Sequence, residues 1–451
     1  MKKLLLIIFI IVLLLSCPAA ASAQSIGIPS DIAYILIDSK TGQVLAEQNA
    51  DQRLEPASTT KIMTAILALE NGDLSKEMNV SLQAVNDIGR GGMNVGIMAG
   101  EKGLTLDNLL HVMLIKSANE TANIIAENLA PSRSEFVDMM NAKAKELGAV
   151  NTTFKNPCGK DTEKEDAGHL TTPRDLGTMA RYAMTLPKFR EIVGTEYYKD
   201  MPVTDKHDDW GILRNTNQFL WFDNTYPYAL DGTEHKYTVT GMKTGYTAAA
   251  GNNLVNSATG EDGMEIIAVV MHVTQPNKIY GYSKELMRYG FENYSMQKIC
   301  TAGQIISNET VEGAKDGIVS IGLQAASDIS SALSMGMDIK DIETKVIMPH
   351  PIKAPVSKGD VLGNAEFRNK GVLIGTVEVN ATQSVEQAPV AAKGNTIPEK
   401  AKPNSSYSYI LLGILVILSV LVITRMILHR VSRKMRKKKY EQKYYSSRDY
   451  D

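Results

Sequence analysis

The two ends of the chain limit which residues can form a folded domain, because each end carries an apolar segment with the flanks of a membrane signal. Residues 1–23 begin with two lysines after Met1, continue with an apolar run from Leu4 to Leu15 and end on Ala21-Ser22-Ala23. A charged start, a short apolar stretch and an A-x-A cleavage site predict a secretory signal peptide. Two alternatives are weaker: lipidation at Cys17, and an uncleaved anchor, for which the run is short.

The second apolar segment, residues 407–428, contains a single charged residue, Arg425. At about 1.5 Å per residue, a helix of this length covers the ~30 Å hydrocarbon core of a membrane. The basic tail that follows, residues 429–451, predicts that this end lies in the cytoplasm. A buried core helix is the alternative, but it does not explain the basic flank. Residues 24–408 are then expected outside the cell membrane.

The segment between these two signals is acidic. Residues 24–408 carry 36 basic and 47 acidic residues, a net charge of −11. Nucleic acid needs a cationic surface, so this composition argues against nucleic acid as a partner. Cys158 and Cys300 remain once the signal peptide is removed, which is too few for a disulfide framework. The sequence leaves open whether they pair or stay reduced.

Strand-like segments at both ends of residues 24–297, with helical patterns between them, predict an α/β domain whose sheet is assembled from both ends. The expected strands are at 33–37, 43–46, 238–240, 253–257 and 266–273, and the expected helices lie after Pro56 and at 106–115, 122–129, 174–184 and 283–289. Residues 298–383 alternate short β-like runs with glycine turns and predict a small β-rich domain. Residues 384–406 have no apolar period and predict a linker.

The first candidate for chemistry is Ser58-Thr59-Thr60-Lys61, at the expected start of a helix. A spacing of three residues places Ser58 and Lys61 on one helix face, about 5–6 Å apart at Cβ. A serine hydroxyl becomes a nucleophile when a neighbouring base takes its proton, and a lysine with a depressed pKa is such a base. We expect burial and the charge of a second lysine, Lys243 of the third sequence element below, to lower the pKa of Lys61. An isolated S-x-x-K match is more often a helix start with a solvated lysine.

Two further elements follow in order. Ser117-Ala118-Asn119 supplies a hydroxyl and an amide, and Lys243-Thr244-Gly245 supplies an amine, a hydroxyl and a close backbone approach in a strand-like stretch. Residues 40–42 also spell Lys-Thr-Gly, but they lie in a predicted turn ahead of Ser58. Each element is weak alone. The ordered set S-x-x-K, S-x-N and K-T-G is the motif set of β-lactamases and penicillin-binding proteins.

With these motifs, the chain resembles the serine D-alanyl-D-alanine carboxypeptidases, which are low-molecular-mass penicillin-binding proteins. The resemblance covers residues 28–383, and the segments that carry it are 56–65, 168–176, 241–251 and 313–317. It implies a transpeptidase-like antiparallel sheet with helices on both faces and a helical subdomain at 24–297. It implies no metal and no cofactor. Its expected partners are peptidoglycan stem peptides ending in D-Ala-D-Ala and, as inhibitors, β-lactams.

The resemblance also assigns roles. Ser58 attacks the carbonyl between the two terminal D-alanines and Lys61 accepts its proton. Ser117 and Asn119 pass a proton to the leaving amine and orient the substrate. The substrate-binding residues of the third motif are Lys243, Thr244, Gly245 and Tyr246, with the backbone N–H groups of Ser58 and Tyr246 as the oxyanion hole.

Three positions depart from the family pattern: Tyr246 stands where His is frequent, Glu120 where Asp is frequent, and the expected downstream Arg is absent between Gln275 and Met287. Lys278 is the candidate substitute for that Arg. There are three alternatives. The first is a β-lactamase, but its glutamate in an E-x-x-L-N run is absent from this sequence between Ser117 and Lys243. The others are a non-catalytic wall-binding protein on the same fold and a zinc peptidase. No H-E-x-x-H pairing supports the zinc enzyme among seven histidines.

Overall fold

A computed structural model describes residues 26–161, 163–230, 232–315, 317 and 319–389. The predicted signal peptide, transmembrane helix and basic tail, with most of the predicted linker, lie outside these described residues. Within them, no helix is both long and apolar enough to cross a membrane.

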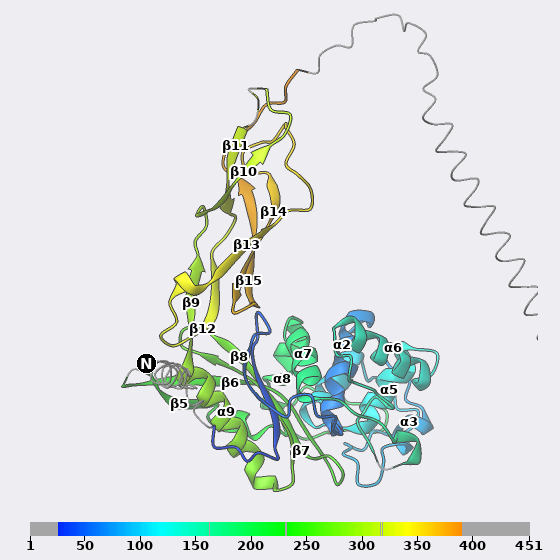
Figure 1. Ribbon diagram of the computed structural model, residues 1–451. Coiled ribbons are helices and arrows are strands. Elements are labelled where there is room, and N and C mark those ends of the chain that lie inside the picture. The colour runs from blue at the N-terminus through cyan, green and yellow to red at the C-terminus, as the bar shows by residue number, and fades with distance from the viewer. Residues whose placement is uncertain (1–25, 162, 231, 316, 318, 390–451) are drawn as a thin grey trace, which may run out of the picture. The chain divides into compact units, whose positions relative to one another are not determined.

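One six-stranded sheet organises the first part of the chain (Figure 1). Its order is β2-β1-β8-β7-β6-β5, and every neighbouring pair is antiparallel. The strands are β1 (Ala33–Asp38), β2 (Val44–Gln48), β5 (Thr225–Leu230), β6 (Thr233–Thr247), β7 (Gly251–Gly260) and β8 (Glu265–Val273). The pairing that joins the first strand of the domain to its last one is β1 with β8, with Leu36 opposite Ala268. The prediction of one sheet built from both ends of the chain is therefore confirmed.

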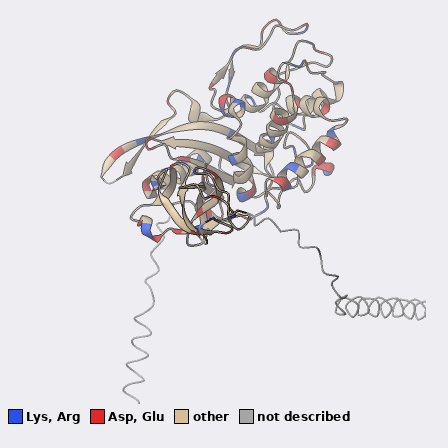
Figure 2. Cartoon of the chain, turned by 90° about the horizontal axis from the view of Figure 1, so that it is seen from above, with Lys and Arg blue, Asp and Glu red and all other residues tan. Residues whose placement is uncertain are grey.

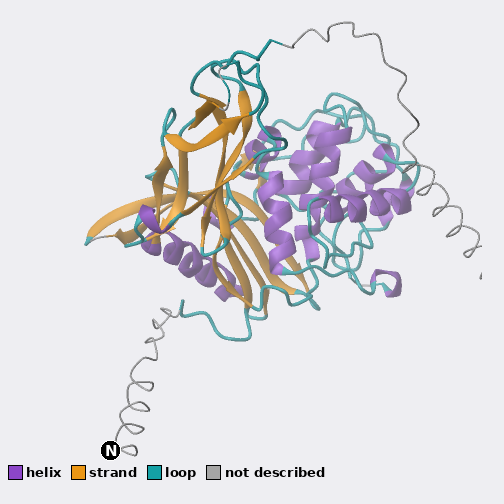
Figure 3. Ribbon diagram, turned by 45° about the horizontal axis from the view of Figure 1, so that its top comes forward, coloured by secondary structure: helices purple, strands orange, loops and turns teal. Residues whose placement is uncertain are grey.

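The period-2 alternation of β1 sends its side chains into two separate cores. Ile35 and Ile37 belong to the core shared with α7 (Pro173–Ala183) and α8 (Pro187–Val193), whereas Tyr34 and Leu36 belong to the core under α9 (Ile279–Asn293). Both faces of the sheet are thus covered by helices, which explains why every residue of β1 is buried (Figure 3). Thr172 caps α7 by accepting from Asp175 N, with Pro173 in its first turn.

The helical part lies between β2 and β5 in sequence. Its helices are α2 (Lys61–Asn71), α3 (Leu82–Asn86), α4 (Leu106–Ile115), α5 (Asn119–Leu129) and α6 (Arg133–Glu146). Thr105 and Asn108 form a capping box that starts α4, and Ser132 accepts from Glu135 N at the start of α6. Acidic and basic residues are interspersed along these helices (Figure 2). The predicted helix at 122–129 begins three residues earlier, at Asn119, so the second motif sits at a helix start.

Short elements connect these layers: the 3-10 turns η1 (Ala57–Thr60), η2 (Lys164–Asp166), η3 (Gln218–Leu220) and η4 (Pro276–Lys278), and the two-residue strands β3 (Tyr197–Tyr198) and β4 (Leu213–Arg214). The predicted helix after Pro56 therefore begins as a 3-10 turn that carries Ser58. Residues 39–41, which include part of the second Lys-Thr-Gly sequence at 40–42, form the turn between β1 and β2, where Thr41 donates to Asp38.

The remaining strands form two further sheets, as the β-rich prediction requires. One pairs β9 (Tyr294–Cys300) with β12 (Ile329–Ser334); the other has the order β10-β11-β15-β14-β13. Their bounds are β10 (Ile305–Val311), β11 (Val319–Ala325), β13 (Glu343–Ile347), β14 (Val361–Asn369) and β15 (Val372–Ala381), with η5 at Ile339–Asp341. Val385 is buried and bridges to Val356, so packed chain continues into the first residues of the predicted linker. Cys158 and Cys300 are separate, buried free thiols.

Candidate active site

The first motif lies in a constrained turn at the start of α2. Ala57 has a φ of +49°, which is unfavourable for a residue with a side chain, and Thr59 holds the turn by donating to Pro56 O at 2.7 Å. Lys61 opens α2 and is completely buried, and its Nζ lies 2.9 Å from Ser58 Oγ. The spacing predicted from the sequence therefore brings the hydroxyl and the amine into hydrogen-bond contact.

Two more acceptors surround the amine of Lys61. Its Nζ donates to Asn119 Oδ1 and to the backbone carbonyl of Cys158, each at 2.7 Å. Burial lowers the pKa of Lys61 from an ordinary 10.5 to about 8, while Cys158 and Glu120 act in the opposite direction. The predicted depression is present because burial penalises the charged form. We expected the charge of Lys243 to lower the pKa of Lys61, but it is not among the causes. The effect runs the other way: the charge of Lys61 lowers the pKa of Lys243.

The second and third motifs meet on the other side of Ser58. Ser117 has a φ of +63° in the short link between α4 and α5, which turns its hydroxyl toward β6. Lys243 is fully buried on β6, and its Nζ donates to Ser117 Oγ at 3.0 Å and to Thr244 O at 2.9 Å. Burial, and after it the charge of Lys61, lowers the pKa of Lys243 well below its ordinary range.

Glycine allows β6 to lie directly against the turn η1, which carries Ser58. A Cβ on Gly245 would lie 3.0 Å from Pro56 O and 3.2 Å from Ser58 N, tighter than an ordinary contact. On β7, Asn253 reinforces this junction by donating to Glu55 O at 2.8 Å. The Lys-Thr-Gly motif is thus a packing device as well as a source of polar groups.

A cavity of about 980 Å³ joins the three motifs. The predicted residues that line it are Ser58, Ser117, Asn119, Thr244, Gly245 and Tyr246. Lys61 and Lys243 are buried behind them. The structure therefore gathers all eight predicted site residues at one cavity, and Tyr246, 65% exposed, stands at its rim.

The segment before α4 closes another side of the cavity. Asn119 Nδ2 donates to Ile88 O at 2.7 Å, and Glu120 accepts from Val95 N at 2.7 Å. Burial is the main reason that the pKa of Glu120 is raised. Glu120, which stands where the family often has Asp, thus holds this segment in place through the hydrogen bond that its carboxylate accepts from Val95 N.

Some site residues were beyond sequence reasoning. Thr216 lines the cavity and shares a 2.7 Å hydrogen bond with Thr244, yet it belongs to no motif. The carbonyl of Cys158 was equally invisible, because backbone groups leave no letter in the sequence. Pro276 and Ile279 line the cavity, whereas Lys278 is not among the described lining residues. The role of Lys278 as the substitute for the missing arginine stays a prediction.

His169, in the segment 168–176, is structural. It is buried and accepts from Lys155 N at Nδ1, so its Nε2 carries the proton and donates to Thr60 Oγ1 at 2.8 Å. Burial lowers the pKa of His169 to about 3, which keeps the ring neutral.

Comparisons with known proteins agree with this architecture. Residues 20–275 match the family described as D-alanyl-D-alanine carboxypeptidase, peptidase S11, and residues 294–387 match the C-terminal domain of penicillin-binding protein 5. The chain is 31% identical to D-alanyl-D-alanine carboxypeptidase DacF of Bacillus subtilis over 381 residues, covering 82% of this chain and 91% of that protein. Penicillin-binding protein 5 of Haemophilus influenzae superposes with a TM-score of 0.62 at 26% identity, covering 80% of this chain and 99% of that one. For PBP3 of Streptococcus pneumoniae the TM-score is 0.63, the identity 26% and the coverage 78% and 98%.

The sheet, its helices and the contact between Ser58 and the buried Lys61 define a serine-type peptidase with a transpeptidase-like α/β fold and a β-rich C-terminal region. Within that class, the chain belongs to the D-alanyl-D-alanine carboxypeptidase family of low-molecular-mass penicillin-binding proteins.

Proposed function

We propose that this protein removes the terminal D-alanine from peptidoglycan stem pentapeptides through an acyl-enzyme on Ser58, and that β-lactams acylate the same serine. The observation that carries the proposal is the 2.9 Å contact between Ser58 Oγ and the buried Nζ of Lys61. A lysine with a pKa of about 8 is partly neutral near physiological pH, so it can act as the base that a serine nucleophile needs.

The proposed reaction begins when Lys61 takes the Ser58 proton and Oγ attacks the carbonyl between the two D-alanines. Negative charge then develops on the oxygen of the attacked carbonyl, which accepts hydrogen bonds from the backbone N–H groups of Ser58 and Tyr246. The carbon–nitrogen bond then breaks, and the departing amine takes a proton by way of Ser117. Water attacks the acyl-enzyme, which releases the shortened peptide and returns the proton to Ser58.

The substrate carboxylate is assigned to the hydroxyl pair Thr244 and Thr216, which lie 2.7 Å apart at the cavity. Buried Lys243 lies behind this pair and supplies positive charge when the carboxylate arrives, since an opposite charge raises the pKa of an amine. Neither Lys278 nor an arginine at the expected downstream position is needed for this arrangement.

We propose the cellular arrangement from the sequence: export by the signal peptide at 1–23, a catalytic domain at 24–297, a β-rich domain at 298–383 and a linker at 384–406. A transmembrane helix at 407–428 then anchors the protein, with the tail at 429–451 in the cytoplasm. The apolar segments with their charged flanks support this arrangement.

The test uses the full chain in detergent with a fluorescent penicillin and a peptide ending in D-Ala-D-Ala. We expect a stable fluorescent adduct and release of D-alanine, both lost in Ser58→Ala and kept in Ser75→Ala, which alters an exposed serine outside the cavity. A wild-type protein that forms no adduct and releases no D-alanine would contradict the proposal.

A β-lactamase activity is the second candidate function, because Glu163 lines the same cavity as Ser58. Rapid release of the hydrolysed drug, dependent on Glu163, would favour that activity. A persistent adduct favours the carboxypeptidase.

A further inference from the structure

The partners of Lys61 impose a condition on its use as a base. A neutral amine has two N–H groups and one lone pair, and the lone pair must face Ser58 Oγ to take its proton. Both N–H groups then need acceptors on the other sides of the nitrogen, and these are Asn119 Oδ1 and Cys158 O, each at 2.7 Å. The first acceptor belongs to a motif, whereas the second is a backbone carbonyl in a turn that no motif marks.

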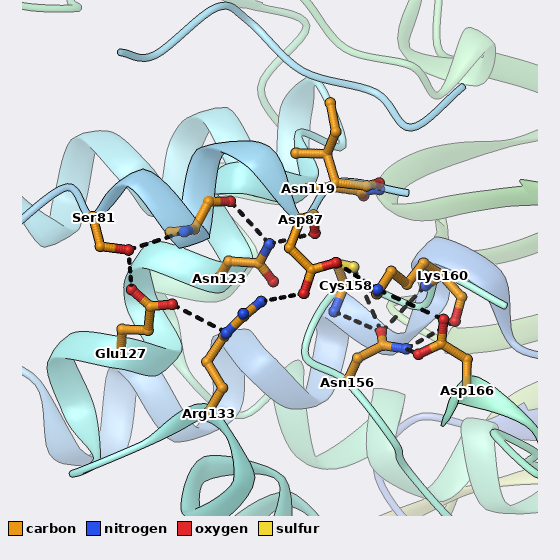
Figure 4. Close-up of polar contacts among 12 residues, drawn as sticks. Ser81, Asp87, Asn119, Asn123, Glu127, Arg133, Asn156, Cys158, Lys160 and Asp166 are labelled. Atoms are coloured by element: carbon orange, nitrogen blue, oxygen red, sulfur yellow. Dashed lines mark hydrogen bonds and ion pairs between the residues drawn. The ribbon is translucent and has the colours of Figure 1, made fainter. Parts of the chain in front are cut away.

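One side chain holds that turn. Asn156 is 6% exposed, and its Oδ1 accepts from Gly159 N at 2.7 Å, Lys160 N at 3.2 Å and Cys158 N at 3.3 Å. Its Nδ2 donates to Lys160 O and to Asp166 Oδ1, both at 2.8 Å (Figure 4). The amide therefore bonds through both its oxygen and its nitrogen, and the three backbone N–H groups that it holds flank the carbonyl of Cys158.

The turn is also pressed against the nucleophile. Gly159 has a φ of +87°, and a Cβ at this position would lie 1.8 Å from Ala57 O, next to Ser58. Thr64, on α2, donates to Pro157 O at 2.6 Å. A displacement of the turn would therefore reach the Ser58 segment and Lys61 together.

The same network extends to the other acceptor of Lys61. Lys160 Nζ pairs with Asp87 Oδ1 at 2.6 Å, and Asp87 also pairs with Arg133 at 2.7 Å (Figure 4). Asp87 precedes Ile88, whose carbonyl accepts from Asn119 Nδ2 at 2.7 Å. The segments that hold both acceptors of the amine are thus tied to one another.

We propose that Asn156 is a positioning residue for the general base: by fixing the carbonyl of Cys158, it orients the Lys61 lone pair toward Ser58. The inference rests on the proposed function, because it concerns the base of that reaction. Asn156 touches no reacting atom, so its effect passes through the carbonyl.

The test is the pH dependence of acylation by a fluorescent penicillin in the full chain. In Asn156→Ala the carbonyl loses its support, and the ammonium form of Lys61 loses more than the neutral form because hydrogen bonds from charged donors are stronger. The pKa of Lys61 then falls. We therefore expect the low-pH side of the profile of acylation rate against pH, its acid limb, to move to lower pH by about half to one unit. The plateau rate falls by about ten-fold to a hundred-fold, since the lone pair is no longer aimed at Ser58.

Two variants separate positioning from general damage. Asn156→Ser keeps a short side chain that accepts from the following N–H groups more weakly, so we expect intermediate shifts, and this variant decides the matter if Asn156→Ala does not fold. Asn141 is the matched control. It clamps the same segment through Phe154 N at 2.8 Å and Phe154 O at 3.1 Å but does not bond to the 156–160 turn. Asn141→Ala is expected to lower thermal stability with no movement of the acid limb.

An acid limb at the wild-type pH in both Asn156 variants would overturn the inference. A limb that moves equally in Asn141→Ala would overturn it as well. If instead the wild-type protein is not acylated at all, the proposed function fails rather than the role of Asn156, so the two failures are distinguishable.

Discussion

Replacement of Gly159 by alanine tests how tightly the 156–160 turn packs against the segment that carries Ser58. At a φ of +87°, the new Cβ would lie 1.8 Å from Ala57 O, 2.4 Å from Ala57 C and 2.9 Å from Thr60 Oγ1. Carbon atoms in ordinary contact stay about 3.5–4.0 Å apart, so the turn and the Ser58 segment must separate by more than about 1 Å. Both sides of this contact are backbone, which cannot swing away as a long side chain does.

The expected cost has two parts. An alanine in the left-handed region costs roughly 1–2 kcal/mol, and overpacking a well-filled site costs roughly 1–3 kcal/mol more. Gly148→Ala is the control, because Gly148 has the same φ of +87° and nothing within 4 Å of its would-be Cβ. It should carry the first cost alone. We expect Gly159→Ala to be destabilised by about 2–5 kcal/mol and Gly148→Ala by about 1–2 kcal/mol.

The assay pairs thermal unfolding with the rate of acylation by a fluorescent penicillin. A displacement of about 1 Å at a reacting group costs about a hundred-fold in rate, so acylation should fall by that order in Gly159→Ala and stay at the wild-type rate in Gly148→Ala. Equal stability losses in the two variants, or an unchanged acylation rate in Gly159→Ala, would show that the turn is not fitted against Ser58 as described.

Three further predictions concern buried titratable groups. Acylation should rise with pH through a midpoint near the Lys61 pKa of about 8, because only the neutral amine accepts a proton; a profile that rises only near about pH 10 contradicts a burial-depressed base. Glu120→Gln removes a negative charge that raises the Lys61 pKa, so the acid limb of the same profile should shift to lower pH, and a shift to higher pH would refute that attribution. His169 has a folded-state pKa of about 3 against an ordinary 6.5, so the unfolded chain binds more protons between these values and stability is lost as pH falls. Unfolding measurements should show a loss of about 2 kcal/mol between about pH 7 and pH 5 that is smaller in His169→Gln, and equal slopes would count against a neutral buried ring.

The residues of the candidate site could be predicted from the sequence alone, because the groups proposed as nucleophile, base and carboxylate-binding groups are side chains at recognisable spacings. Ser58 and Lys61 are one helical turn apart, so local geometry already predicts their contact. The apolar run at 33–37, followed by a turn and a second strand-like segment, likewise predicted β1, and the strand signals at both ends of the domain predicted a shared sheet.

What the sequence could not supply were relations between distant segments and contributions from the backbone. Thr216 and Thr244 meet only because the chain before η3 lies beside β6. The second acceptor of Lys61 is the carbonyl of Cys158, 97 residues away along the chain, and a carbonyl is the same atom pair in every residue. The sequence predicted that the pKa of Lys61 is lowered, but not that burial alone lowers it while Cys158 and Glu120 raise it, because burial depends on how the interior packs. Local chemistry follows from the letters, whereas distances between segments far apart in the chain are fixed only when the sheet and helices pack.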